Sequence, residues 1–336
     1  MIPALPIAKN ESPAPIRKNV SLRLLLTAFG PFFGLLIVVG LFSVLPQTRP
    51  FFLTGGNLKI ILTQTVIVAI GALGMTMIII SGGIDLSVGS SIALTSVVGA
   101  TLLVHNVSPF FVVILTILAG GLIGFFNGTI IAGFKMMPFI VTLGMMGIAR
   151  GTAKWLANSQ IVNPPETSVS TFMAANEPTQ FFPLPPGVWI TIGLACVMSV
   201  VMRRTVFGRY IFAIGSNEAA ARLCGIRVPL QKIIIYTLGG LFCGLAGLMQ
   251  LSRLTQGDPT VAVGLELDII AAVVIGGASL SGGSGGILGS MIGALIMAVL
   301  RSGSNQMDIP TYMQEIVIGF IIILAVGLDK LRQRRA

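Results

Sequence analysis

The chain has 336 residues, of which 54% are apolar and 10% are charged, and its formal net charge is +10. A soluble domain carries roughly 25% charged residues, so this composition excludes an ordinary soluble protein and indicates that a lipid bilayer surrounds most of the chain. The positive charge does not indicate nucleic-acid binding, because that function needs Lys and Arg clustered on one face of a soluble fold.

The chain begins with a polar, proline-rich segment, residues 1–22, that we expect to form a cytoplasmic tail. The apolar run that follows, residues 23–45, is longer than the roughly 7–15-residue core of a cleaved signal and has no small-residue cleavage site. We therefore expect this run to remain as the first membrane span.

Ten segments approach the length of about 20 mainly apolar residues that a spanning helix needs. Two of them are short and can form a broken or re-entrant pair, which leaves eight to ten spans. The sequence predicts an all-α, polytopic transmembrane bundle with glycine-interrupted segments, in one membrane domain over residues 23–329. The ten segments are 23–45, 58–80, 86–104, 109–133, 138–156, 187–202, 233–251, the short pair 266–281 and 287–300, and 311–328.

The positions of Lys and Arg predict the topology, because these residues concentrate in short cytoplasmic loops. With ten spans, the basic connection 203–232 and the basic tail 330–336 lie on the same side as the N-terminus. We expect a multi-pass protein of a bacterial inner membrane with both termini in the cytoplasm. The long connection 157–186, rich in Pro, Asn, Ser and Thr, is then a periplasmic loop that can meet an external partner.

Two glycine-containing motifs in the sequence resemble one another. Gly82–Gly89 matches Gly276–Gly283, and each lies between two apolar segments. Repeats that place glycine-interrupted hydrophobic segments in corresponding positions often mark a transport pathway. The alternative is chance similarity in a chain with 41 glycines.

The segment 109–133 contains glycines at three- and four-residue steps. This spacing lets two helices approach closely in lipid, and we expect it to be a packing feature. The glycines are Gly120, Gly121, Gly124 and Gly128.

Asp85 is an acidic residue between two long apolar segments. An unpaired charge inside a membrane is costly, by at least about 2.5 kcal/mol, so Asp85 is a candidate for the substrate pathway. It can instead cap the helix that begins near Leu86, with Ser87 and Gly89 supporting a break there. Both interpretations stay open.

Other residues could line a pathway for a polar substrate. A sugar favours amide, hydroxyl and aromatic side chains, whereas a carboxylate favours Arg or the N-terminus of a helix. We select Ser87, Asn127, Phe139 and Thr142 together with Asp85, and Gln64 and Trp155 are also available.

The basic connection contains a short Ala-rich stretch with signals for both helix ends. Asn217 or Ser216 can cap its N-terminus, Glu218 suits the positive end of the helix dipole, and Gly225 can terminate it. A short rigid helix on the cytoplasmic side is what a soluble motor domain needs to grip. The alternative is an ordinary surface loop.

No motif for catalysis is recognisable. Gly282–Gly286 resembles a phosphate-binding loop, but no lysine occurs between Lys232 and Lys330, so this segment cannot serve ATP hydrolysis in that way. The three cysteines are far apart and the chain has one histidine, which leaves no set of metal ligands. We expect a protein that is not an enzyme, with no catalytic residues and no metal site.

Taken together, four motifs resemble the ribose/xylose/arabinose permease family of ABC importers. They are the inner loop, the Gly82–Gly89 motif, Pro138–Gly144 and Glu266–Gly277, in the same order over residues 58–329. The resemblance implies a permease for a pentose or hexose that works with a cytoplasmic ATPase, a periplasmic sugar-binding protein and a second permease copy in a homodimer. ATP and Mg²⁺ would bind the ATPase, and this chain would bind no cofactor.

The resemblance also assigns the inner loop as the segment that docks on the ATPase. The implied coupling residues are Gly215, Asn217, Glu218, Ala220, Ala221, Arg222, Gly225 and Ile226.

Three other functions remain to be compared with this one. An ABC permease for a nucleoside or a branched-chain amino acid differs only in its cargo. A secondary transporter predicts several acidic residues inside the membrane, where Asp85 is the clear example. A membrane-bound enzyme or a structural scaffold is disfavoured by the absence of a catalytic motif.

Overall fold

The computed structural model describes residues 20–174 and 184–333. Over these residues the chain is helical apart from its connections and one isolated β-bridge, between Val162 and Gly257. The helices are α1 (Val20–Val44), α2 (Arg49–Phe52), α3 (Gly55–Ile80), α4 (Val88–Val104), α5 (Pro109–Phe134), α6 (Pro138–Leu156), η1 (Ser170–Phe172), α7 (Pro186–Arg204), α8 (Val206–Ser216), α9 (Glu218–Leu223), α10 (Val228–Leu254), α11 (Leu265–Ile275), α12 (Ile287–Gln306) and α13 (Thr311–Gln333).

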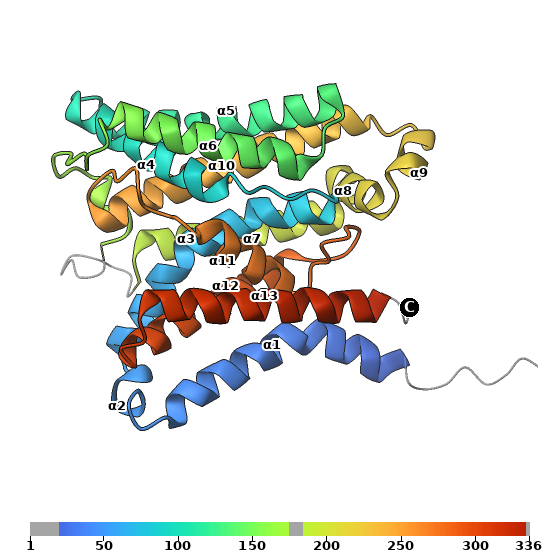
Figure 1. Ribbon diagram of the computed structural model, residues 1–336, viewed down its shortest axis with the longest axis horizontal. Helices are drawn as coiled ribbons and strands as arrows, with labels where there is room; N and C mark the ends of the chain where they lie inside the picture. The colour runs from blue at the N-terminus through green and yellow to red at the C-terminus, as the bar shows by residue number, and fades with distance from the viewer. Residues whose placement is uncertain (1–19, 175–183, 334–336) are drawn as a thin grey trace, which may run out of the picture.

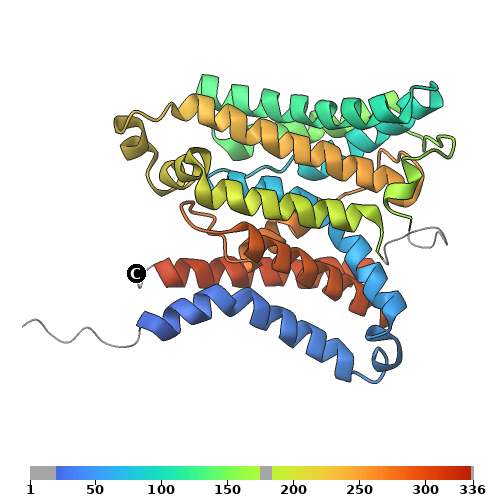
Figure 2. The same ribbon diagram turned by 180° about the vertical axis from the view of Figure 1, so that it is seen from behind.

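The long helices lie side by side along the long axis of the molecule (Figure 1). Helices α5, α6, α4 and α10 form one side, α1 and α13 form the other, and α3 lies between them. The start of α1, the end of α13 and the short helices α8 and α9 are at the same end of this bundle, as the reverse view also shows (Figure 2). We call this the α9 end, and the other end, which carries α2 and η1, the η1 end.

Each of the ten predicted segments coincides with a helix, which confirms the all-α bundle. Within residues 20–174 and 184–333, five helices are long and apolar enough to cross a membrane, namely α3, α5, α7, α10 and α12, and shorter apolar helices accompany them. Several predicted boundaries differ from the helix ends by five or six residues: α10 begins at Val228 and not at 233, α12 ends at Gln306 and not at 300, and α13 ends at Gln333 and not at 328. The segment 266–281 is helical only over Leu265–Ile275, about 16 Å at 1.5 Å per residue, which is roughly half of a bilayer core. It ends early because Gly276 and Gly277 close its last turn.

The two glycine motifs form equivalent structures, but the sequence comparison paired the residues of the two motifs one position out of register. Gly82 and Gly277 both have positive φ, +83° and +93°, directly after the end of α3 and of α11. Their amides donate to the carbonyls three residues back, Ile79 and Val274. Gly82 therefore corresponds to Gly277 and not to Gly276, because the left-handed backbone at the helix end fixes the equivalence.

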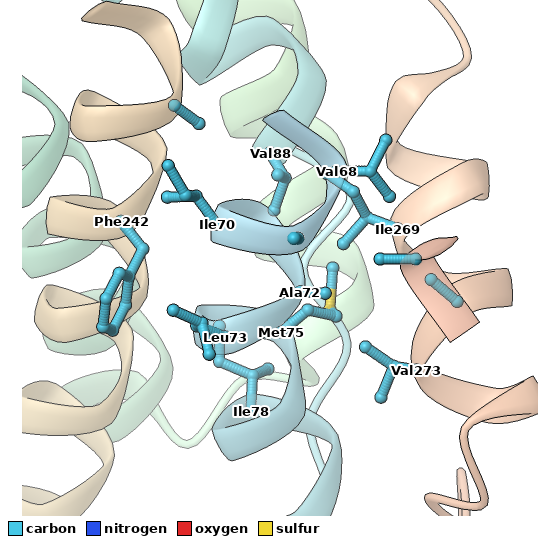
Figure 3. Packing of buried hydrophobic residues seen from close by; sticks show 14 of the residues in the cluster. Val68, Ile70, Ala72, Leu73, Met75, Ile78, Val88, Phe242, Ile269 and Val273 are labelled. Atoms are coloured by element: carbon cyan, nitrogen blue, oxygen red, sulfur yellow. The ribbon is translucent and has the colours of Figure 1, made fainter. Parts of the chain in front are cut away.

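Helix α3 forms the centre of the core. Its residues 66–80 are buried on every side, as expected for a helix that is apolar all round. Figure 3 shows Val68, Ile70 and Leu73 of this helix among side chains from α4, α10 and α11, including Val88, Phe242, Ile269 and Val273. The Gly82–Gly89 motif that follows α3 is thus attached to a tightly packed helix.

Helices α5 and α10 pack closely through glycines, as the sequence predicts. A Cβ added to Gly120 would lie 2.3 Å from the carbonyl oxygen of Gly240, and one added to Gly124 would lie 2.1 Å from that of Tyr236. Only glycine permits this separation of the two backbones.

The connections differ partly from expectation. The predicted tail 1–22 and the segment 175–183 lie almost wholly or wholly outside the described residues, while α13 continues into the predicted tail 330–336 as far as Gln333. The described part of the 157–186 connection is not simply exposed, because Val169 and Met173 are 1% and 4% exposed. Its position is fixed by Ser252, which accepts a hydrogen bond from the Met173 amide at 2.9 Å and donates one to the Ser170 carbonyl at 3.0 Å.

Candidate functional site

The short helices at the α9 end begin with side-chain caps. The Thr205 hydroxyl accepts a hydrogen bond from the Gly208 amide at 3.2 Å and starts α8. Helix α8 then buries Ile211 and Ile214 against the bundle. It is an amphipathic helix at the end of the bundle and was not predicted separately within the 203–232 connection.

Helix α9 is the short Ala-rich helix that the sequence predicts. Asn217 is its N-cap, and its side-chain oxygen accepts from the Ala220 amide at 2.9 Å. After the helix, Gly225 has a φ of +84°, and the Gly225 and Ile226 amides donate back to its last carbonyls. The cap favours a single backbone path between α8 and α10.

Glu218 joins α9 to the start of α10. Its carboxylate accepts from Lys232 at 2.7 Å and from Arg222 at 3.0 Å. The hydrogen bond from Lys232 lowers the pKa of Glu218 below its ordinary value, in spite of partial burial, and Arg222 adds to this effect. The resulting stabilisation is present above the ordinary Glu value and is lost only as the pH falls through the lowered one, so both contacts are ionic at neutral pH.

The predicted coupling residues divide into two groups. Ala221 and Ile226 pack inward with Ile214 and Val228, whereas Ala220 and Arg222 are exposed. A groove of about 490 Å³ on the exposed side is lined by Glu218, Ala219, Arg222 and Leu223. Leu223 was not selected as a coupling residue from the sequence. It is 90% exposed and is the largest apolar side chain of α9.

Gly215, at the C-terminal end of α8, touches both glycine-containing breaks. A Cβ added to it would lie 1.7 Å from the Ile80 carbonyl oxygen, at the end of α3, and 2.6 Å from the Gly283 amide nitrogen. These two groups bond to each other, because the Gly283 amide donates to the Ile80 carbonyl at 2.9 Å. We call this contact of Gly215, Ile80 and Gly283 the glycine junction.

Four of the five predicted pathway residues meet in one buried region, where α4 begins. The Asp85 carboxylate accepts from the Ser87 amide at 2.8 Å and from its hydroxyl at 2.6 Å, and Asn127 donates to that hydroxyl at 3.0 Å. The Thr142 hydroxyl accepts from the Leu86 amide at 3.2 Å. These contacts hold the break after α3 against α5 and α6, and the capping interpretation of Asp85 accounts for its two hydrogen bonds to Ser87.

The fifth residue, Phe139, is not part of this network. It is 51% exposed on the outer face of α6. None of the five lines any of the cavities described for residues 20–174 and 184–333. Their role in a pathway stays a prediction.

Charged side chains that sequence reasoning did not pair meet near the η1 end. Arg301 of α12 donates through Nε to the Asp268 carboxylate of α11 at 2.9 Å, and Asp268 is 1% exposed. Arg150 of α6 donates to the carbonyls of Pro259 and Val261 at 3.0 and 2.6 Å. Arg150 therefore fixes the 255–264 connection in place.

The architecture defines the class of the protein. A bundle of apolar helices with a half-length helix and two glycine breaks that contact each other through Ile80 and Gly283 is the construction of a membrane transport protein, in which irregular backbone lies inside the bundle. The short helices at one end are a separate, exposed element attached to those breaks.

Comparison with known proteins identifies the family. Residues 57–326 match the family described as branched-chain amino acid transport system / permease component. The chain is 41% identical over 300 residues to the ribose import permease of Escherichia coli strain K12, covering 89% of this chain and 94% of that protein. It is 39% identical over 323 residues to the ribose import permease of Bacillus subtilis strain 168, covering 96% and 98%.

A third relative is the L-arabinose ABC transporter permease of Azospirillum brasilense, 37% identical over 311 residues, which covers 90% of this chain and 88% of that protein. No solved structure matches the chain at a significant level. The chain belongs to this family of ABC transporter permeases and is an integral membrane protein, which confirms the resemblance seen in the sequence.

Proposed function

We propose that this chain is the membrane permease of an ATP-driven importer that moves a monosaccharide, a pentose or a hexose, across a bacterial inner membrane. The glycine junction carries the proposal: one end of α8, next to α9, touches the ends of both repeat-related breaks. The relatives named as ribose and arabinose permeases support the class of cargo.

The chain works with partners that supply energy and substrate. A cytoplasmic ATPase binds ATP and Mg²⁺ and docks on α9 through Glu218, Arg222 and Leu223. Closure of the ATPase moves α8 and shifts the glycine junction, so that the bundle alternates between two states with different openings. The permease itself performs no covalent chemistry and holds no cofactor.

The orientation follows from the charges of the connections. The α9 end carries the basic connection with Arg203, Arg204 and Arg209, so it faces the cytoplasm together with both termini. The η1 end faces the periplasm and receives a sugar-binding protein. A second permease copy completes the pathway as a homodimer.

A branched-chain amino acid is the second candidate cargo, because the description of the matched family names it. Such a cargo carries a carboxylate and an ammonium group and needs charged partners for both. Uptake of labelled sugars compared with uptake of a labelled branched-chain amino acid separates the two candidates.

The test is ATP-dependent uptake into vesicles that hold the chain with its ATPase and binding protein. Labelled ribose, arabinose and isoleucine serve as substrates, and Glu218→Lys is compared with the native chain. We expect uptake of a sugar that needs both partners and falls about tenfold in Glu218→Lys, because the substitution places like charges beside Lys232 and Arg222.

The matched control is the charge-swapped double variant Glu218→Lys with Lys232→Glu, which keeps an ion pair between α9 and α10. Recovery of uptake in this double variant would show that Glu218→Lys acts by disturbing the local structure. No recovery would show that it acts at the docking surface. Uptake by the chain alone under an ion gradient would overturn the proposal in favour of a secondary transporter.

A further inference from the structure

A polar chamber lies between four helices near the η1 end. Its volume is about 290 Å³. Small-molecule sites range from about 300 to 1,000 Å³, so this chamber lies at the lower limit of that range and has room for only one very small ligand. Its polar side chains are Gln64 of α3, Gln250 and Arg253 of α10, Asp268 of α11, and Arg301 and Asn305 of α12.

The chamber adjoins a larger vestibule that opens at the η1 end. The vestibule has a volume of about 860 Å³, and its walls include Thr167 and Ser170 of the 157–174 connection. Gln64 and Arg253 line both spaces. These two side chains therefore stand where a solute would pass from the vestibule into the chamber.

The floor of the chamber is an ion pair between a buried carboxylate and a partly exposed guanidinium, since the Arg301 side chain is 33% exposed. Asp268 is 1% exposed, and two guanidinium nitrogens of Arg301 donate to one of its oxygens. A charged pair inside a membrane bundle is expensive to maintain, and such groups mark pathways and binding sites more often than packing. Arg253 makes no ion pair within the described part of the chain, so a second guanidinium that is not ion-paired lines the chamber.

The roof is held rigidly by contacts outside the chamber. Val261, Ala262 and Val263 line it from above. Arg150 holds the Pro259 and Val261 carbonyls, and the bridge between Val162 and Gly257 joins the roof to the neighbouring connection through hydrogen bonds of 2.9 and 2.8 Å. The Val261 side of the chamber is thus held in place by hydrogen bonds to α6 and to the 157–174 connection.

The chemistry of the lining fits a polyhydroxyl solute, although its two arginines taken alone would also suit a carboxylate. Guanidinium and amide groups donate to hydroxyl oxygens, and carboxylate and amide oxygens accept from hydroxyl groups. An amino acid would also need an acceptor for its ammonium group, and the one acidic side chain of the lining is already bonded to Arg301.

Affinity at this site is expected to be low. The lining residues include no aromatic ring on which a sugar could stack. Low affinity suits a transit site, because a transported solute must leave as readily as it enters.

We infer that this chamber is a transient binding site for one monosaccharide inside a single permease subunit, with Gln64 and Arg253 at its entrance and the Asp268–Arg301 pair at its floor. The inference rests on the proposed function.

Uptake by the complete transporter is the first test. Arg253→Gln and Gln64→Leu are expected to lower ATP-dependent uptake of ribose or arabinose about tenfold, by loss of hydrogen bonds to the solute. Arg49→Gln is the matched control, because Arg49 is exposed at the same end and lines neither space. The amounts of permease and of bound ATPase are measured for each variant.

Protection of a thiol is the second test and does not depend on transport. Val263→Cys is introduced into a chain whose Cys196 and Cys224 are replaced by Ser, because both are exposed. Val263 lines the chamber and is 73% exposed. Millimolar ribose or arabinose is expected to slow labelling of Val263→Cys in the nucleotide-free transporter, and isoleucine is expected to have no effect.

The outcomes separate the two proposals. If the native transporter imports no sugar from a panel of pentoses and hexoses, the proposed function fails. If it imports a sugar while Arg253→Gln and Gln64→Leu match Arg49→Gln and no sugar protects Val263→Cys, the chamber is not a transit site. Protection by isoleucine alone would overturn the inference in favour of a zwitterionic cargo.

Discussion

At the scale of single residues, the hydrogen bonds of Asp85 favour a capping role, and its role in a pathway stays a prediction. Two of its hydrogen bonds go to Ser87, at the start of α4, and Asn127 also bonds to its carboxylate. An Asx side chain that bonds the backbone two residues ahead stabilises a turn, and here it fixes where the helix begins after the break.

Asp85→Ala removes the acceptor and leaves the buried Ser87 amide without a partner. A buried unsatisfied group costs about 1–3 kcal/mol, so we expect a thermal midpoint in detergent that is several degrees lower. Asp85→Asn keeps an oxygen for the Ser87 amide and is expected to retain most of the stability.

Uptake measured on the same two variants completes this prediction. A structural cap predicts that uptake follows stability, so that Asp85→Asn transports almost normally. Loss of uptake in a fully stable Asp85→Asn would show that the charge itself serves the pathway.

The sequence identified polar residues but could not pair them. Asn127 and Thr142 were selected by residue type, and the structure joins them to the same break through Ser87 and Leu86. Asp268 and Arg301 lie 33 positions apart on two helices, and no periodic pattern relates them. Such a pair becomes visible only when the packing of α11 on α12 is known.

At the scale of helices, the apolar length of each segment was sufficient to place it, whereas the ends of the helices depended on backbone conformation. The end of α11 at Ile275 is set by the positive φ of Gly277, and the apolar residues beyond it suggested a longer helix. Helix α8 was missed because its 11 residues are too few for a span and Gly208 interrupts its sequence, although burial of Ile211 and Ile214 stabilises it in place.

The glycine junction gives the prediction at this scale. Gly215→Ala places a methyl group where the Ile80 carbonyl and the Gly283 amide already meet, so α8 must move away from both breaks. Overpacking of this kind costs about 1–3 kcal/mol. We expect ATP hydrolysis by the assembled transporter to continue while uptake per ATP falls severalfold.

Gly193→Ala is the matched control, because a Cβ at that position on α7 meets no atom within 4 Å. The measurement is uptake and hydrolysis in the same vesicles. Equal uptake per ATP in the two variants would exclude the junction as the connection between the ATPase and the breaks.

At the scale of the whole molecule, the distribution of charge predicted the arrangement of the ends. The start of α1, the end of α13 and the α8–α9 pair lie at one end of the bundle, as alternation of ten segments requires (Figure 1). A half-length α11 does not disturb this order, since the chain turns at Gly276–Gly286 and continues into α12. Which side of the membrane this end faces depends on the positive-inside rule alone.

Labelling of the natural cysteines tests that orientation. Cys224 is exposed directly after α9, whereas Cys243 is buried and Cys196 lies in an apolar groove of α7. A charged, membrane-impermeant thiol reagent is expected to modify Cys224 in inside-out vesicles and not in intact spheroplasts, because only an exposed thiol at the aqueous surface forms enough thiolate to react.

His105→Cys in a Cys224→Ser chain provides the opposite reporter, because His105 is exposed at the η1 end. The new thiol of His105→Cys should react with the reagent in intact spheroplasts and not in inside-out vesicles. Added ATPase should slow the labelling of Cys224 and leave His105→Cys unchanged, since α9 is the proposed docking surface. Reaction of Cys224 from outside would reverse the orientation and would remove α9 from the reach of any cytoplasmic ATPase.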